Sequence, residues 1–235
     1  MQLTVLGSRA AYPGAGSACS GCLVEEGETK LLVDCGTGVL SNLQRVVELK
    51  DVNYIVISHL HADHCFDLIP YRHALTRPQY KELHPYLYLP PGGRDMLLKL
   101  VSAFDALSTF FSDYFFVREY DPTATLKLGD LSIEFASVKH YIKDYAMAIS
   151  GSKRIVYSAD SGLCDELEAL AHDADLFLCE ATKCDHHDAD WGHLSADEVG
   201  MLSKKAGVKR LMLTHFWPDC DYSPNIRQAE AAFGR

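Results

Sequence analysis

Four potential metal ligands fall within six consecutive positions of the chain. The stretch ISHLHADHCFD (57–67) contains His59, His61, Asp63 and His64. Residues two positions apart do not share a helix face, so His59 and His61 are expected in a loop where alternate side chains converge on one point. Asp63 and His64 follow directly and can turn toward a second point. This mixture of imidazole and carboxylate donors indicates a site for Zn, Mn, Fe or Ni.

Four further donors end apolar runs that have the length of β-strands. His140 ends LSIEFASVKH, Asp160 ends RIVYSAD, Glu180 ends LFLCE and His215 ends RLMLTH. In layered α/β folds ligands bind at the carboxyl ends of strands, so these side chains are expected to meet at one site. Two sets of three ligands that share one carboxylate would form a dinuclear centre, with its metals roughly 3.5–4 Å apart. A set of surface histidines in a polar loop is the alternative, and the apolar strand before His59 argues against it.

The elements that must position these donors alternate along the chain. Short apolar runs bounded by turn residues predict β-strands over 3–6, 30–34, 54–58, 86–89, 131–138, 145–150, 154–160, 176–180 and 210–215. Helical periodicity predicts α-helices over 38–50, 94–107, 163–174 and 195–207, and from Pro224 onward. The helix over 195–207 opens with a capping box formed by Ser195 and Glu198. Because strands and helices alternate without a linker or a repeat, we expect one α/β domain over residues 1–235.

Charge and hydropathy indicate the kind of ligand and the compartment of the protein. The formal net charge is −10, with 32 acidic and 22 basic residues. Nucleic-acid affinity comes mainly from Lys and Arg that neutralise phosphates, so this balance favours a small ligand over a polymer. No apolar run reaches the roughly 18 residues of a membrane span, and the first residues lack the pattern of a signal peptide. A cytoplasmic protein is therefore expected, and its eight cysteines are expected to be free thiols rather than disulfides.

Several motifs resemble those of a known family. HLHADH matches the HxHxDH signature of the metallo-β-lactamase superfamily, whose fold is a four-layered αββα sandwich. LVDCGTG (32–38), SVKH (137–140), YSADSG (157–162) and LTHF (213–216) occur in the order of that family. CEAT (179–182) and GHLSADEVG (192–200) are similar to motifs of its ribonuclease Z branch. The resemblance covers nearly the whole chain and implies a metal-dependent hydrolase.

The resemblance also implies a role for each donor. One metal would be held by His59, His61 and His140, the other by Asp63, His64 and His215, with Asp160 bridging the two. Zinc is the first choice for both metals, and manganese or iron are alternatives. Glu180 would orient His193, which would protonate a leaving oxygen or stabilise charge on a phosphoryl oxygen, and Asp63 would also help to orient the nucleophile. A hydrogen-bonded histidine at a helix start is the alternative for His193.

The spacing of these motifs also indicates the kind of substrate. Members of the ribonuclease Z branch that process tRNA carry a long arm between the segments matching SVKH and YSADSG, whereas here 19 residues separate His140 from Asp160. We therefore expect a hydrolase of a small or cyclic phosphodiester or ester, with tRNA disfavoured as a partner and no membrane partner. The alternatives are a lactone, thioester or β-lactam hydrolase with the same metals, a non-catalytic metal or ligand sensor, and a di-iron redox protein. A homodimer stays open, because members of this branch are often dimers.

Four other features have no settled role in the sequence. The segment 104–120 holds seven aromatic residues in seventeen positions, and could be core, a pocket wall, a lid or a subunit contact. Arg72, Arg77 and Lys81 either meet an anionic substrate or lie on a solvated face. The CxxC pair Cys19 and Cys22 either belongs to the core or, with Cys220, holds a structural zinc as in some cyclic phosphodiesterases similar to this family. His186 and His187 either recruit a metal or belong to a polar loop before His193.

Overall fold

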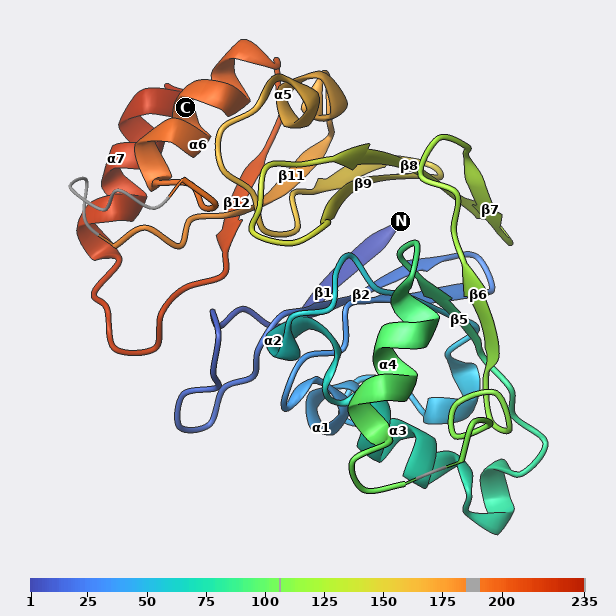
Figure 1. Cartoon of the computed structure of the whole chain (residues 1–235). Helices are drawn as coiled ribbons and strands as arrows, with labels where there is room; N and C mark the ends of the chain where they lie inside the picture. The colour runs from blue at the N-terminus through green and yellow to red at the C-terminus, as the bar shows by residue number, and fades with distance from the viewer. Residues whose placement is uncertain (106, 185–190, 235) are drawn as a thin grey trace.

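Two six-stranded β-sheets form the centre of the computed structural model, which describes residues 1–105, 107–184 and 191–234. The first sheet has the order β1-β2-β3-β4-β5-β6 and the second the order β12-β11-β10-β9-β8-β7 (Figure 1). The strands of the first sheet are β1 (Gln2–Gly7), β2 (Gly21–Glu26), β3 (Thr29–Val33), β4 (Tyr54–Val56), β5 (Tyr86–Leu89) and β6 (Phe116–Glu119). Those of the second are β7 (Leu126–Leu128), β8 (Leu131–Ser137), β9 (Tyr145–Ser150), β10 (Arg154–Tyr157), β11 (Leu176–Glu180) and β12 (Leu211–Thr214).

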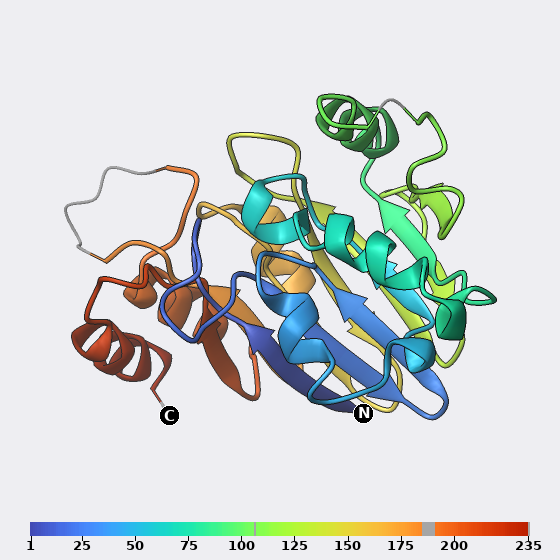
Figure 2. The ribbon, with the colours of Figure 1, turned by 90° about the horizontal axis from the view of Figure 1, so that it is seen from below.

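Helices cover the outer face of each sheet. The helices α1 (Val39–Leu43), α2 (Ala62–Cys65), α3 (Leu68–Leu75) and α4 (Gly93–Val101) belong to the first half of the chain, with the short 3₁₀ helices η1 (Leu49–Asp51) and η2 (Pro78–Tyr80). The helices α5 (Asp165–Ala171), α6 (Ala196–Lys205) and α7 (Ser223–Phe233) belong to the second half. Figure 2 shows the blue and cyan helices lying across the outer face of the first sheet. None of the helices in the described ranges has the length and apolar composition to cross a membrane.

Three buried clusters hold the four layers together, and strand alternation explains them. In β3, Leu31 and Val33 point to the cluster between the two sheets, whereas Leu32 points to the cluster under the helices of the first half. Successive side chains of a strand face opposite sides, so an uninterrupted apolar run is what a sheet covered on both faces needs. A third cluster packs β10 and β11 against α5, α6 and α7. The predicted four-layered αββα sandwich is thus the observed fold.

Most predicted elements are present, with shifted ends. All nine predicted strands form, and the capping box of Ser195 and Glu198 is made at the start of α6. The predicted helix over 38–50 is wrong in length, because α1 ends at Leu43 and the chain continues through turns to η1. The strands β2, β6 and β7 and the helices α2 and α3 lie outside the ranges given for the predicted elements. Pro70 masks the periodicity of α3, but it lies in the first helical turn, where its missing N–H costs no helical hydrogen bond.

The aromatic segment 104–120 is largely core. Phe110, Phe111 and Phe115 are buried in the cluster under the helices of the first half, whereas Phe104 and Phe116 are exposed. Tyr120 is buried between the sheets, and its hydroxyl donates to the carbonyl oxygens of Ile57 and Ser58 at 3.1 Å each. The segment therefore supports the chain where it leaves β4 for the predicted metal loop.

The solvated face expected for Arg72 is wrong. Arg72 is buried rather than solvated, because its guanidinium lies 4.5 Å from the ring centre of Phe110 and 4.6 Å from that of Tyr114. Its Nε also donates to the carbonyl oxygen of Phe110 at 3.0 Å. A buried guanidinium stacked between rings is a packing element of α3. Arg77 and Lys81 are exposed, as expected for a solvated face.

We expect Phe110→Ala to destabilise the fold strongly. Phe110 is fully buried, so the truncation leaves a cavity under Arg72 and should lower the free energy of unfolding by about 3–5 kcal/mol. Phe116→Ala is the matched control, because this phenylalanine is 46% exposed and its loss should cost less than about 1 kcal/mol. Urea unfolding measures both. Equal losses for the two variants would contradict the assignment of the segment to the core.

Candidate metal centre

The first four donors lie where β4 passes into α2. His59 and His61 are in the irregular stretch after β4, and Asp63 and His64 are in the single turn of α2. His61 has extended backbone angles at the helix start, which lets it and His59 face one point from alternate positions. The backbone of Gly36 packs against this turn, where a side chain would collide with the carbonyl of Asp63. The close approach of the two backbones thus explains Gly36, the first glycine of the motif LVDCGTG.

Three donors from the second sheet meet them. His140 follows β8, Asp160 follows β10 and His215 follows β12. The seven predicted ligands fall into two clusters, in each of which the donor atoms lie within 4.8 Å of one another. One cluster is His59, His61, His140 and Asp160, and the other is Asp63, His64, His215 and Asp160. The structure thus brings the seven residues together around the shared carboxylate of Asp160; that they bind metal stays a prediction.

The spacing of the donor atoms fits metal ions. His61 Nδ1 lies 3.1 Å from the Nε2 atoms of both His59 and His140, and the Nε2 atoms of His64 and His215 are 3.3 Å apart. A tetrahedral zinc with Zn–N bonds of about 2.0–2.1 Å holds its nitrogen ligands about 3.3 Å from each other. Asp160 Oδ1 is buried without a hydrogen-bond partner, 3.3 Å from both His64 Nε2 and His215 Nε2. A buried carboxylate oxygen without a donor is strongly unfavourable unless a cation compensates it.

Four of the five imidazoles are held by the nitrogen that faces away from the cluster. His64 Nδ1 donates to Asp34 at 2.8 Å, His140 Nδ1 to the carbonyl of Gly192 at 2.9 Å, and His215 Nδ1 to Thr182 Oγ1 at 2.7 Å. His59 Nδ1 hydrogen-bonds to Ser58 Oγ at 3.0 Å and lies 3.1 Å from Asp144 Oδ2. These bonds fix the tautomer that leaves Nε2 bare for a cation. His61 is the exception, because its Nδ1 points into the cluster.

The sequence reasoning missed the two carboxylates among these anchors. Asp34 is fully buried after β3 in the left-handed region (φ 58°), and accepts from Ser58 N, Ser58 Oγ and Tyr157 Oη. Asp144 is fully buried and accepts from Asp160 N at 3.0 Å. Asp34 lies in the motif LVDCGTG, but no role was expected for it. Asp144 precedes a strand, so a search of strand ends passes over it.

Burial keeps two of the clustered imidazoles, His59 and His61, neutral. Burial, together with the neighbouring charge of His64, lowers the pKa of His59 to about 3. Burial and the nearby His59 and His140 lower the pKa of His61 to about 4. These rings are therefore neutral at pH 7, which is the form that binds a metal. Burial and the charge of Asp34 raise the pKa of Tyr157 well above its usual value, so its hydroxyl remains a donor.

Beside the two clusters lies the predicted pair of Glu180 and His193. Glu180 is fully buried at the end of β11, and its Oε1 accepts from His193 Nδ1 and from Ser161 N at 2.8 Å each. Its Oε2 accepts from Thr182 and from Leu194 N. The ring of His193 lies 5.0 Å from that of His140 and 5.7 Å from that of His215, centre to centre. The carboxylate therefore orients the imidazole directly over the clusters, as expected; the catalytic role stays a prediction.

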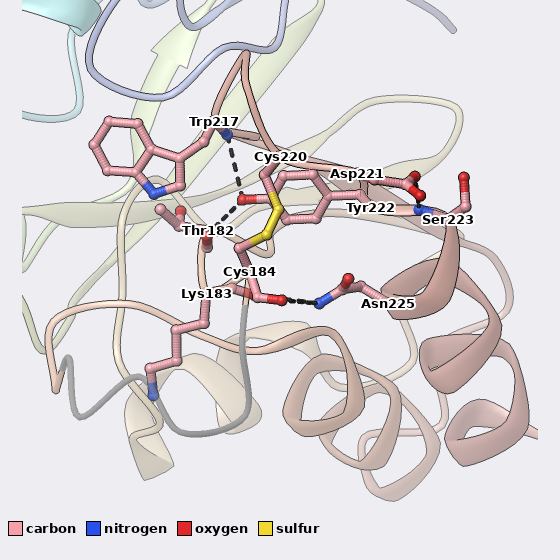
Figure 3. Close-up of a disulfide and its surroundings, with 9 residues drawn as sticks. All are labelled: Thr182, Lys183, Cys184, Trp217, Cys220, Asp221, Tyr222, Ser223 and Asn225. Atoms are coloured by element: carbon pink, nitrogen blue, oxygen red, sulfur yellow. Dashed lines mark hydrogen bonds between the residues drawn. A yellow bond between two sulfur atoms is a disulfide. The ribbon is translucent and has the colours of Figure 1, made fainter.

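Two cysteines form a disulfide, which corrects the expectation of free thiols. Cys184 and Cys220 follow the neighbouring parallel strands β11 and β12, so their Cα atoms lie 6.4 Å apart although 36 positions separate them (Figure 3). Beside the disulfide, Tyr222 Oη donates to the carbonyl of Thr182 at 2.6 Å. This pairing removes Cys220 from the zinc site suggested with the CxxC pair.

The CxxC pair itself belongs to the core. Cys19 and Cys22 are buried free cysteines. Burial, with the charge of Asp63, raises the pKa of Cys19 to about 12, so a thiol rather than a thiolate ligand is present at neutral pH. His186 and His187 lie outside the described residues.

A match to a protein-family model shows the family of the chain. The model of the Anti-Pycsar protein Apyc1 family matches residues 1–233. The chain belongs to this family. Among curated relatives of this Apyc1-family chain, the uncharacterized protein Rv1339 of Mycobacterium tuberculosis is 36% identical, over 99% of this chain and 87% of its own length. The probable metallo-hydrolase YhfI of Bacillus subtilis is 33% identical, over 97% of this chain and 91% of its own length.

Solved structures agree on the fold. The crystal structure of YhfI, a metallo-β-lactamase fold protein, superposes with a TM-score of 0.85 at 29% identity, and covers 98% of this chain and 92% of YhfI. The short form of human tRNase Z gives 0.76 at 24% identity, over 92% of this chain and 93% of that one. The Apyc1-family chain is thus a metallo-hydrolase of the metallo-β-lactamase fold. Its ribonuclease Z-like relationship is supported by Ribonuclease Z 1 of Schizosaccharomyces pombe, which is 30% identical over 86% of this chain.

We expect Asp144→Asn to weaken metal binding. The amide keeps the shape of the carboxylate but loses the charge that holds Nδ1–H of His59, so the metal affinity should fall about 10–100-fold. Competition with a chromogenic chelator measures this affinity, and circular dichroism checks the fold. Asp121→Asn, at an exposed position, is the matched control. An unchanged affinity in the Asp144 variant would refute the anchoring role.

Proposed function

We propose that the chain is a dinuclear metal-dependent phosphodiesterase that hydrolyses a small or cyclic phosphodiester. The observation that carries the proposal is the Glu180–His193 pair, because it places an oriented proton donor beside two ligand clusters that share Asp160. Metal ions bound there would supply a water of lowered pKa and would polarise the phosphoryl oxygen. A charged leaving oxygen needs a proton, and the oriented imidazole is suited to give it.

Hydrogen bonds within the chain fix the side chains that would act on the substrate. Glu180 accepts from Nδ1 of His193, so this carboxylate sets the orientation of the imidazole. The side chain of His193 is 12% exposed, enough to be reached by a ligand while still largely shielded from water. Asp63 Oδ2 accepts from Ala11 N at 2.7 Å and lies 3.2 Å from His215 Nε2, so this carboxylate is fixed in position as well. Pre-set geometry of this kind reduces the reorganisation needed in the transition state.

A small substrate is favoured over tRNA. The stretch between His140 and Asp160 consists of β9 and β10 in antiparallel pairing, joined by a short turn, so no arm extends from the fold there. The net charge of −10 also opposes a broad contact with a phosphate backbone. Ribonuclease Z 1 of Schizosaccharomyces pombe is 30% identical over 86% of this chain, and its name supports phosphodiester chemistry, but the match spans 29% of that protein.

We expect activity to follow the metal content. The isolated protein should contain about two metals per chain by mass spectrometry, with zinc expected first, and should hydrolyse bis-p-nitrophenyl phosphate. Chelation should abolish turnover because Asp160 and the imidazoles alone supply no hydroxide at neutral pH, and added metal should restore it. A panel of lactones and thioesters is the comparison. Turnover of that panel without phosphodiester turnover would favour the carbonyl alternative, and loaded metal without any turnover would favour a sensor.

We expect His193→Ala to lower kcat by about 10²–10⁴-fold with the metal content unchanged. The imidazole is not among the seven predicted ligands, so its loss should remove proton transfer and leave the clusters intact. Steady-state kinetics and metal analysis on one preparation measure both quantities. His172→Ala is the matched control, because that side chain is 70% exposed at the end of α5. Unchanged turnover in the His193 variant would be inconsistent with a catalytic role.

A further inference from the structure

Two exposed aromatic side chains, Tyr141 and Trp191, lie together beside the metal centre. Tyr141 directly follows the predicted ligand His140, and Trp191 lies two positions before His193. Each of the two is 50% exposed, and their ring centres are 4.9 Å apart with the ring planes at 71°. Single exposed apolar side chains are normal on a protein surface, whereas two large ones that meet from separate loops are a candidate binding surface.

This aromatic pair of Tyr141 and Trp191 contacts the site itself. The ring centre of Tyr141 lies 5.1 Å from that of His140 and 6.1 Å from that of His193. Aromatic rings interact when their centres are about 4.5–7 Å apart. Tyr141 therefore borders both a predicted metal ligand and the predicted proton donor. A phosphoryl group bound between these two histidines would hold its ester group within reach of the aromatic pair.

The backbone around the aromatic pair allows a close approach that fixes its position. A side chain at Gly192 would collide with the ring of Tyr141, and one at Gly162 would collide with the carbonyl of Trp191. The carbonyl of Gly192 also accepts from His140 Nδ1 at 2.9 Å. The segment that carries Trp191 is thus tied to a predicted metal ligand, so the aromatic pair keeps a defined position relative to the clusters.

Shape and charge indicate what the aromatic pair would bind. Aromatic rings favour offset-stacked and edge-to-face contacts with one another. Because the planes of Tyr141 and Trp191 are at 71°, a flat ring that stacks on one of them lies edge-to-face with the other. The Nζ atom of Lys139 lies 5.8 Å from the ring centre of Trp191, and its positive charge favours an anionic ligand. A phosphodiester that carries an aromatic group has both properties.

We propose that Tyr141 and Trp191 bind a flat aromatic ring of the phosphodiester substrate, and so set a preference for aromatic over aliphatic esters. The inference rests on the proposed function and adds to it the kind of group that the substrate carries. The contacts of Tyr141 with His140 and His193 are what join the aromatic pair to the place where the phosphoryl group is expected.

Competitive inhibition by two phosphonates tests the proposal. Phenylphosphonate and methylphosphonate present the same anion to the metal-loaded chain, but only the first carries a ring. The ratio of their Ki values, measured against bis-p-nitrophenyl phosphate, therefore reports the contact with the ring, and the unmodified chain should prefer phenylphosphonate. Trp191→Ala and Tyr141→Ala should each reduce this preference about fivefold, because each removes one ring contact. Trp191→Phe and Tyr141→Phe should retain most of the preference, because a flat ring remains.

Phe116→Ala is the matched control for this test. Phe116 is 46% exposed and begins β6, which runs parallel to β5 and β4, so it lies at the opposite end of the strands from the end that leads to His59. Its loss should leave the ratio unchanged. The metal content and the Ki of methylphosphonate are measured for each variant and should not change, because the predicted ligands keep their anchors.

Two results would contradict the proposal, and they can be told apart. The same preference in the unmodified chain and in both alanine variants, with bis-p-nitrophenyl phosphate still hydrolysed, would overturn the role of the aromatic pair and leave the phosphodiesterase standing. A metal-loaded chain that does not hydrolyse bis-p-nitrophenyl phosphate would overturn the proposed function and the role of the aromatic pair with it.

Discussion

Each buried imidazole that points at a cation must be held from its other nitrogen, and this requirement organises the molecule. Asp34, Asp144, Thr182 and the carbonyl of Gly192 meet it for four histidines. Without such a bond the ring could rotate or take the other tautomer, and the bare nitrogen would no longer face the cluster. The anchors are buried themselves, so they in turn need donors, and the network spreads into both sheets.

This network joins the two sheets at the edge where the clusters lie. Tyr157, at the end of β10 in the second sheet, donates at 2.9 Å to Asp34, which follows β3 in the first. His59, after β4 of the first sheet, lies 3.1 Å from Asp144, which directly precedes β9 of the second. The buried Asp160 Oδ1 has no hydrogen-bond partner, so cations at the clusters would satisfy it and would favour the folded chain. Metal binding and the docking of the sheets are therefore expected to support one another.

The sequence predicts those features of the fold and the site that are encoded by residues close together in the chain. The apolar runs, the ligand density of 57–67 and the donors at strand ends are local, and they lead to the sandwich and to the seven residues that the structure brings together. Asp144 was missed because its partners come from β4 and β10, far along the chain. Cys184 and Cys220 were missed because only the pairing of β11 with β12 makes them neighbours. Arg72 was misjudged because charge suggests a surface, whereas the rings that stack on it come from another segment.

The two sides of the site are held to different degrees. The predicted ligands His61 and His140 belong to one cluster, whereas Leu60 and Ile142 beside them in the chain are half-buried. On the other side, Glu180 accepts from five groups, so the orientation of His193 is held by the core and not by the substrate. The orientation of His193 is thus set before a substrate binds, which reduces the reorganisation needed in the transition state.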